Sequence, residues 1–137
     1  MIEENWKYWI PSEGITSSYV LANFTYGSNG VTVILEHIEG GHPIYKLDFG
    51  ESTELCRILE ERSATLTYSA VTKNKGKDFF VKKSFFIVEN SKLIEWLKEE
   101  SGYLEHFDLK HFVLMNDDSV FDIVAQSDPE IEIIENT

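Results

Sequence analysis

Hydrophobic and polar residues alternate in short segments along this chain, and turn residues recur about every eight to twelve positions, as in mostly antiparallel β proteins. Tyr19–Ser28, Val31–Ile38 and Pro43–Phe49 are rich in aromatic and β-branched residues, and Asn29-Gly30 and Gly40-Gly41 separate them. Asn-Gly is a strong hairpin signal because both residues tolerate positive φ. The pattern therefore predicts a meander of three strands in this region.

The hydrophobic pattern of the next segment, Thr53–Arg62, is compatible with both a helix and a strand. Leu55, Ile58 and Leu59 match helical spacing, whereas Leu55 and Leu59 flank Arg57 in an alternation typical of a strand. We favour a strand that ends in a short turn at Glu60-Glu61.

Ala64–Thr72 alternates more regularly, with Leu66, Tyr68 and Ala70 on one predicted face. This alternation predicts a strand. A hairpin turn at Asn74-Lys75-Gly76 would join it to a further strand over 78–88, with lysines flanking the turn as they often do at exposed sheet edges.

The clearest helix signal covers Lys92–Ser101, with Ser91 or Asn90 suited to the N-cap and Gly102 to the left-handed position after the helix. The strands predicted after it are Leu109–Met115, Ser119–Ala125 and Glu130–Ile134. We therefore expect an α+β fold: a mostly antiparallel β-sheet of about eight strands with one helix, at about 91–101, packed on it. The length of 137 residues fits a single globular domain over 1–137.

Charge narrows the classes of partner. The chain has 24 acidic and 12 basic Lys or Arg residues, for a net charge of −12. This balance argues against nucleic acid and against an anionic membrane surface, both of which attract basic proteins. No apolar run is long enough to span a membrane, and the first residues lack the features of a signal peptide, so we expect a cytoplasmic protein. Cys56 is the single cysteine and is expected to be a buried thiol.

The charges are unevenly distributed. From Leu104 onward there are nine acids and one base, whereas five of the lysines fall within 73–83. Both sets are compatible with ordinary solvated surface. The alternative is an acidic face that steers a basic protein partner, and its predicted contact residues are Asp117, Asp118, Glu130 and Glu132.

Catalytic and metal-binding motifs are not apparent in the sequence. His37 with His42, and His106 with His111, form two similar pairs with an acid between them, but neither spacing matches a known metal motif. His37 and His42 straddle the Gly40-Gly41 turn, so they are able to approach each other across it. We predict no metal site, no cofactor and no catalytic residues.

Two further features have a structural and a functional interpretation. Asp122 shares a strand face with Val120 and Val124, so it lies at a sheet edge or is buried beside a cation, for which Arg57, Arg62 and Lys110 are the first candidates. The aromatic residues Trp6, Tyr8 and Trp9 indicate a core strand or, if exposed, a binding patch.

A series of short motifs occurs in a fixed order near the C-terminus: Phe86–Ser91, Ile94–Leu97, Glu100-Ser101, His111-Phe112, Asp122–Val124 and Pro129. This series resembles a set of small bacterial proteins, some of which are encoded beside secreted polymorphic toxins. The resemblance covers about the last 50 residues. It implies an immunity protein, and it implies no catalytic residues.

The sequence thus favours a non-enzymatic protein-binding module, and the resemblance implies an immunity protein that neutralises a basic toxin domain through its acidic surface. One alternative is a small ligand- or metal-binding domain, with a pocket between helix and sheet lined by aromatic residues and one histidine pair. Another is a homo-oligomer in which the lysines of 73–83 contact the acidic face of a neighbouring copy.

Overall fold

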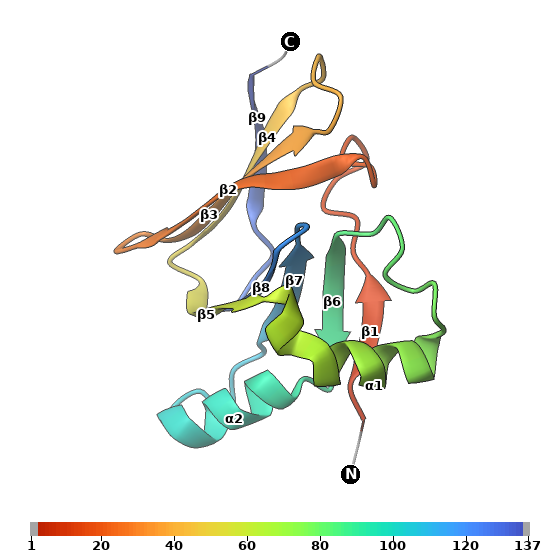
Figure 1. Ribbon diagram of the computed structural model, residues 1–137. Helices are drawn as coiled ribbons and strands as arrows, with labels where there is room; N and C mark the ends of the chain where they lie inside the picture. Colours follow the sequence, from red (N-terminus) through yellow and green to blue (C-terminus); the bar gives the residue numbers. More distant parts are fainter. Residues whose placement is uncertain (1–2, 136–137) are drawn as a thin grey trace.

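The chain folds into two antiparallel sheets and two α-helices in the computed structural model, which describes residues 3–135 (Figure 1). Sheet A contains, in spatial order, β1 (Asn5–Tyr8), β6 (Phe85–Glu89), β7 (Lys110–Met115), β8 (Ser119–Ala125) and β5 (Thr53–Glu60). Sheet B contains β2 (Tyr19–Gly27), β3 (Gly30–His37), β4 (Ile44–Gly50) and β9 (Glu130–Glu135). The helical elements are η1 (Glu61–Ala64), α1 (Thr65–Lys75) and α2 (Lys92–Ser101).

The two sheets pack face to face around one hydrophobic core. Phe112 and Ile123 from sheet A meet Val33, Leu35 and Leu47 from sheet B, and all five side chains are fully buried. Because side chains alternate along a strand, alternate residues of the central strands β3, β4, β7 and β8 reach this shared core. Neither sheet therefore has a separate core on its inner face.

The helices cover the other face of sheet A, so the molecule has three layers (Figure 1). Val71 of α1 belongs to the cluster around Phe86 and Val113, whereas Leu97 of α2 packs in a cluster with Val124. Strands β7 and β8 are consequently buried on both faces. This explains why their sequences are almost continuously apolar instead of alternating.

Most elements agree with the sequence-based prediction. The meander appears as β2–β3–β4, and the ambiguous segment is strand β5 followed by the short turn of η1. Helix α2 begins after Ser91, whose Oγ accepts a hydrogen bond from the Ile94 backbone N–H at 3.1 Å, and it ends at Gly102 with φ of 73°. The fold class is α+β and is dominated by antiparallel sheet, as expected.

Three predictions about the arrangement were wrong. Residues 64–72 form η1 and α1 and not a strand, so there is a second helix, and the strands make two sheets instead of one. Ala64, Tyr68 and Val71 recur at helical spacing and pack against sheet A, and this burial outweighs the alternation that predicted a strand. Gly76 is not in a hairpin turn; its N–H caps α1 by donating to the Thr72 carbonyl at 2.8 Å.

The predicted strand over 78–88 is also shorter than expected, because only Phe85–Glu89 pairs in the sheet. The preceding Phe79 and Phe80 pack against Phe86 and the indole of Trp6. Trp6 itself is buried in β1, which supports the core-strand interpretation of the N-terminal aromatic residues, although Tyr8 is half exposed.

Among the described residues, no helix combines the length and the apolar character that a membrane crossing requires. Residues 1–2 and 136–137 of the predicted domain lie outside the described part.

Candidate functional site

A cavity of about 610 Å³ lies on the face of sheet A that carries the helices. Its walls are mainly apolar and come from β1 and the residues before it, from β5, β7 and β8, and from η1, α1 and α2. Among them, Trp6 is buried, whereas the indole of Trp96 on α2 is half exposed. The remaining wall residues are Glu4, Leu55, Cys56, Arg57, Leu59, Ala64, Thr67, Lys92, Leu93, His111, Val120 and Asp122. The alternative prediction placed a histidine pair in an aromatic pocket between helix and sheet. This cavity has two tryptophans in its wall but only one histidine, His111.

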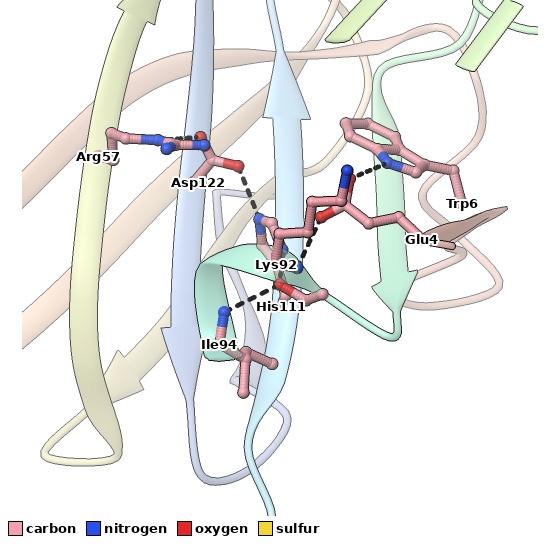
Figure 2. A network of polar contacts seen from close by, with 8 residues as sticks. Glu4, Trp6, Arg57, Lys92, Ile94, His111 and Asp122 are labelled. Atoms are coloured by element: carbon pink, nitrogen blue, oxygen red, sulfur yellow. Dashed lines mark hydrogen bonds and ion pairs between the residues drawn. The ribbon is translucent and has the colours of Figure 1, made fainter. Parts of the chain in front are cut away.

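Asp122 is the centre of a polar network in this otherwise apolar face (Figure 2). The strand register places Arg57 of β5 directly opposite it, and the Arg57 Nε donates to Asp122 Oδ2 at 3.0 Å. His111 of β7 lies diagonally across, with Nε2 2.6 Å from Asp122 Oδ1. The Asp122 side chain is 4% exposed, so both partners are needed to satisfy its carboxylate. Of the cations considered from the sequence, Arg57 is the partner.

The network continues from His111 to the start of α2. Ser91 Oγ lies 2.7 Å from His111 Nδ1 and also accepts the Ile94 N–H. The neutral imidazole with its proton on Nε2 satisfies every group: Nε2–H donates to Asp122, and Nδ1 accepts the Ser91 hydroxyl proton. Among the described residues, no buried side-chain polar atom is left without a partner. The chain of bonds therefore fixes α2 to the centre of sheet A.

Ser91, His111 and Asp122 have the residue types of a hydrolase triad, but their arrangement differs. In such triads the serine contacts Nε2 and the acid contacts Nδ1, which is the reverse of the order here. Ser91 is also buried, caps α2 and does not line the cavity. This geometry favours a structural role for the network. Cys56, which was expected to be a buried thiol, is only partly buried and lines the cavity. Its partial burial raises the pKa of the thiol, which disfavours the thiolate that a nucleophile requires.

A second carboxylate, Glu4, lies at the other side of the cavity and holds the first turn of α2 (Figure 2). Its Oε2 accepts the Lys92 backbone N–H at 2.8 Å, while Oε1 is 3.4 Å from the Trp6 indole nitrogen. An acidic side chain is favourable at this position because the N-terminus of a helix carries partial positive charge. The polar part of the cavity wall is therefore held on one side by the hydrogen bonds of Glu4 and on the other by those of Asp122.

An acidic hollow of about 470 Å³ lies beside this cavity, where the end of β5 meets the β7–β8 turn. It is lined by Glu60, Glu61, Asp117 and Asp118, together with Arg62 and Ser119. The Glu61 N–H donates to the Asp118 carbonyl at 2.9 Å and holds the two turns together. Arg62 Nε forms an ion pair with Glu60 Oε2 at 2.7 Å. Carboxylates therefore remain in excess in the acidic hollow.

The predicted partner-binding acids fall into two separate pairs. Asp117 and Asp118 are in the acidic hollow, whereas Glu130 and Glu132 are on β9 at the edge of sheet B. Glu132 forms an ion pair with Lys46 at 3.0 Å, and this interaction raises the pKa of the lysine. The acidic hollow therefore combines Asp117 and Asp118 with Glu60 and Glu61, which were not among the predicted contact residues.

The two histidine pairs predicted from the sequence differ in whether their members lie close together. His37 and His42 stack with their ring centroids 3.7 Å apart, as their positions around the Gly40-Gly41 turn allowed. His111 is buried in the network of Asp122, whereas His106 is exposed in the loop after α2. His106 and His111 therefore form no joint site. The contacts of His111 were not predicted from the sequence, because Ser91, His111 and Asp122 come from three different elements. The available signal was the charged residue Asp122 in the apolar run of β8.

Comparison of the chain with protein-family models, with curated proteins and with solved structures gave no match. The resemblance to proteins of toxin loci therefore remains a prediction.

Proposed function

We propose that this protein is a non-enzymatic protein-binding module that binds a basic segment of a partner protein in the acidic hollow. The observation that carries the proposal is the convergence of Glu60, Glu61, Asp117 and Asp118 from two turns that are far apart in sequence. A backbone hydrogen bond fixes these turns, so the carboxylates are positioned before a partner arrives. Preorganised charge of this kind raises association rates and favours oppositely charged partners.

The adjoining cavity supplies the apolar part of such an interface. Leu59 and Val120, which are paired across β5 and β8, line the cavity, and the next pair, Glu60 and Ser119, lines the hollow. Trp96 is 51% exposed at the cavity rim. Half-exposed tryptophans beside a cavity are typical anchors in protein interfaces. A partner segment with an apolar residue next to lysine or arginine fits this surface.

The resemblance to proteins encoded beside polymorphic toxins suggests the biological setting. Under it, the partner is a basic toxin domain, the protein acts in the cytoplasm, and binding neutralises the toxin. The buried, reversed arrangement of Ser91, His111 and Asp122 supports a role without catalysis.

The proposal is tested by capturing proteins from the native host on the immobilised protein at low salt. Quantitative mass spectrometry would compare the wild type with a variant carrying Glu60→Gln, Glu61→Gln, Asp117→Asn and Asp118→Asn. We expect a basic protein that binds the wild type, elutes at high salt and is reduced at least about tenfold on the variant, because exposed charge attraction is screened by salt.

A matched control removes the same charge elsewhere, by Glu99→Gln, Glu100→Gln, Glu105→Gln and Asp108→Asn, all at exposed positions. This control should retain the captured protein. Glu130→Gln with Glu132→Gln tests the other predicted pair in the same way. A basic protein captured equally by the variant of the hollow and by the wild type would contradict the proposed site.

A second candidate function is binding of a small molecule in the cavity. The cavity volume of about 610 Å³ and its apolar walls with a few convergent polar groups are typical of ligand sites. Binding of a ligand there should quench tryptophan fluorescence, and Trp96→Ala should reduce the quenching, with Trp6 in the same wall as the remaining reporter. A fluorescence screen of polar aromatic compounds that gives no quenching would count against this candidate and leave the acidic hollow as the binding site.

A further inference from the structure

The connection between β3 and β4 brings two imidazoles and one carboxylate together on the surface of sheet B. Ligating atoms of His37, Glu39 and His42 all lie within 4.8 Å of one another. The two rings stack at 3.7 Å between centroids, with 16° between their planes. This cluster lies outside the cavity and the acidic hollow.

The backbone of the connection makes this convergence possible. Gly40 and Gly41 have φ of 72° and 69°, a region that other residues rarely adopt. The Gly40 N–H donates to the His37 carbonyl at 3.0 Å, which closes the turn. Two successive left-handed residues reverse the chain, and His42 returns beside His37.

The position of His37 is supported from beneath by Tyr19. The His37 and Tyr19 rings pack in a T-shaped arrangement, with 5.3 Å between ring centroids and 85° between the ring planes. Tyr19 is 2% exposed, and its hydroxyl donates to the Pro43 carbonyl at 2.7 Å, just after His42. One buried tyrosine thus links both sides of the turn, so the first imidazole is held in place, while His42 and Glu39 are exposed and free to adjust.

We propose that His37, Glu39 and His42 bind a divalent transition-metal ion of the zinc class. Imidazole nitrogen and carboxylate oxygen are ligands for zinc, copper and nickel, and two histidines with one glutamate are a known set of three zinc ligands. Such a set leaves a coordination position for water or for a group of a bound partner. The site departs from the expectation of no metal, which rested on sequence spacing alone.

Metal binding requires a small local rearrangement. Donor atoms around a tetrahedral zinc ion lie about 3.4 Å apart, so ligating atoms that are now up to 4.8 Å apart must approach by at most about 1.4 Å. The parallel rings must also splay to aim their nitrogens at one point. His37 Nδ1 accepts a hydrogen bond from the Glu39 backbone N–H at 3.1 Å. This exposed hydrogen bond is lost if Nδ1 binds the metal or carries the ring proton.

Titration of the untagged protein with zinc chloride in a calorimeter tests the site. We expect one ion per chain with micromolar affinity, and at least about 100-fold weaker binding for His37→Ala or His42→Ala. Glu39→Gln should weaken binding about tenfold, because it removes one ligand. NMR of the imidazole nitrogens should show zinc-dependent shifts for His37 and His42 and none for His106.

Controls separate the site from general binding of cations to an acidic surface. His106→Ala is the matched control and should bind zinc like the wild type, since His106 is exposed and remote from the turn in sequence. Gly41→Ala strains the left-handed position without a steric clash and should weaken binding while the thermal midpoint shows the fold is retained. Zinc binding that persists unchanged in His42→Ala, or no binding at 100-fold excess of zinc over a 10 µM protein sample, would overturn the proposal.

Discussion

At the scale of single residues, Asp122 shows how an isolated charge is accommodated in a layer that is otherwise apolar. Its carboxylate is 4% exposed and is held between Arg57 and His111. Arg57 is 46% exposed and still reaches water, whereas His111 depends on Asp122 and Ser91 for its polar contacts. Removal of the acid therefore affects the histidine more than the arginine.

We predict that Asp122→Ala lowers the free energy of unfolding by about 3–5 kcal/mol, because it leaves a buried imidazole and a guanidinium without their acceptor. Arg57→Met should cost much less, since the guanidinium is half exposed and the carboxylate keeps His111. Urea denaturation of both variants measures the difference. Equal losses would show that the ion pair with Arg57, and not the bond to His111, carries the stability.

Cys56 provides a prediction with a defined pH dependence. Burial raises the pKa of its thiol, so the folded protein keeps the proton at pH values where an unfolded chain has lost it. The stabilisation linked to this proton is complete below the pKa of the unfolded thiol and is lost as the pH rises through the folded pKa. At pH 8, alkylation by iodoacetamide should be at least about tenfold slower in the native protein than in urea. Similar rates in both states would contradict the protection that partial burial gives the thiol.

At the scale of elements, α1 differs most from what its sequence indicates. Thr65–Lys75 is rich in β-branched and hydroxylic residues, and its alternation predicts a strand. Its position on sheet A is decided by Ala64 and Val71, which are buried against that sheet. Leu66, which shares a face with Tyr68 in a strand, is instead 87% exposed.

Leu66→Ala distinguishes the two structures of this segment. In the helix the side chain is in water, so the free energy of unfolding should change by less than about 0.5 kcal/mol. In a strand it would face the core, and its loss would cost about 2–5 kcal/mol. Val71→Ala is the matched variant on the same helix and should cost about 1–3 kcal/mol, since Val71 is 7% exposed. Thermal or urea unfolding of both proteins gives the comparison.

At the scale of the whole molecule, net charge affects stability. The chain carries −12, and the compact state brings these charges closer than the unfolded state does. Raising sodium chloride from 20 to 300 mM should therefore raise the thermal midpoint by a few degrees, since screening shortens the Debye length from about 20 Å to about 6 Å. The variant with Glu99→Gln, Glu100→Gln, Glu105→Gln and Asp108→Asn should show a smaller rise. A midpoint that falls with salt would indicate that attractive pairs outweigh the repulsion.

The molecular mass at low and high salt also distinguishes the third expectation, a homo-oligomer, from a monomer. If lysines of 73–83 contact the acidic hollow of a neighbouring copy, light scattering should show an oligomer at 20 mM salt that dissociates at 300 mM. Lys82 and Lys83 already line a broad surface hollow together with Asp117 and Asp118 of the same chain. A monomer at both salt concentrations would contradict this expectation.

The sequence by itself determined the elements whose signals are local. Asn29-Gly30 marked a hairpin, in which Ser28 and Asn29 form the turn and Gly30 has a φ of 84°, a position that few other residues tolerate. Ser91 with Gly102 marked both ends of α2. The apolar runs of β7 and β8 indicated strands, whereas their burial on both faces came from the structure. The fold class followed from these signals.

Only the tertiary structure decided the division into two sheets, the helical state of α1 and the grouping of the polar residues. These depend on contacts between residues far apart in sequence, such as Val71 with the Phe86 cluster and Glu61 with Asp118. Local propensity differs between helix and strand by less than 1 kcal/mol per residue, whereas a buried side chain contributes about 1.5–3 kcal/mol. Burial therefore outweighs propensity wherever the two disagree, and the partners that provide the burial are known only once the chain has folded.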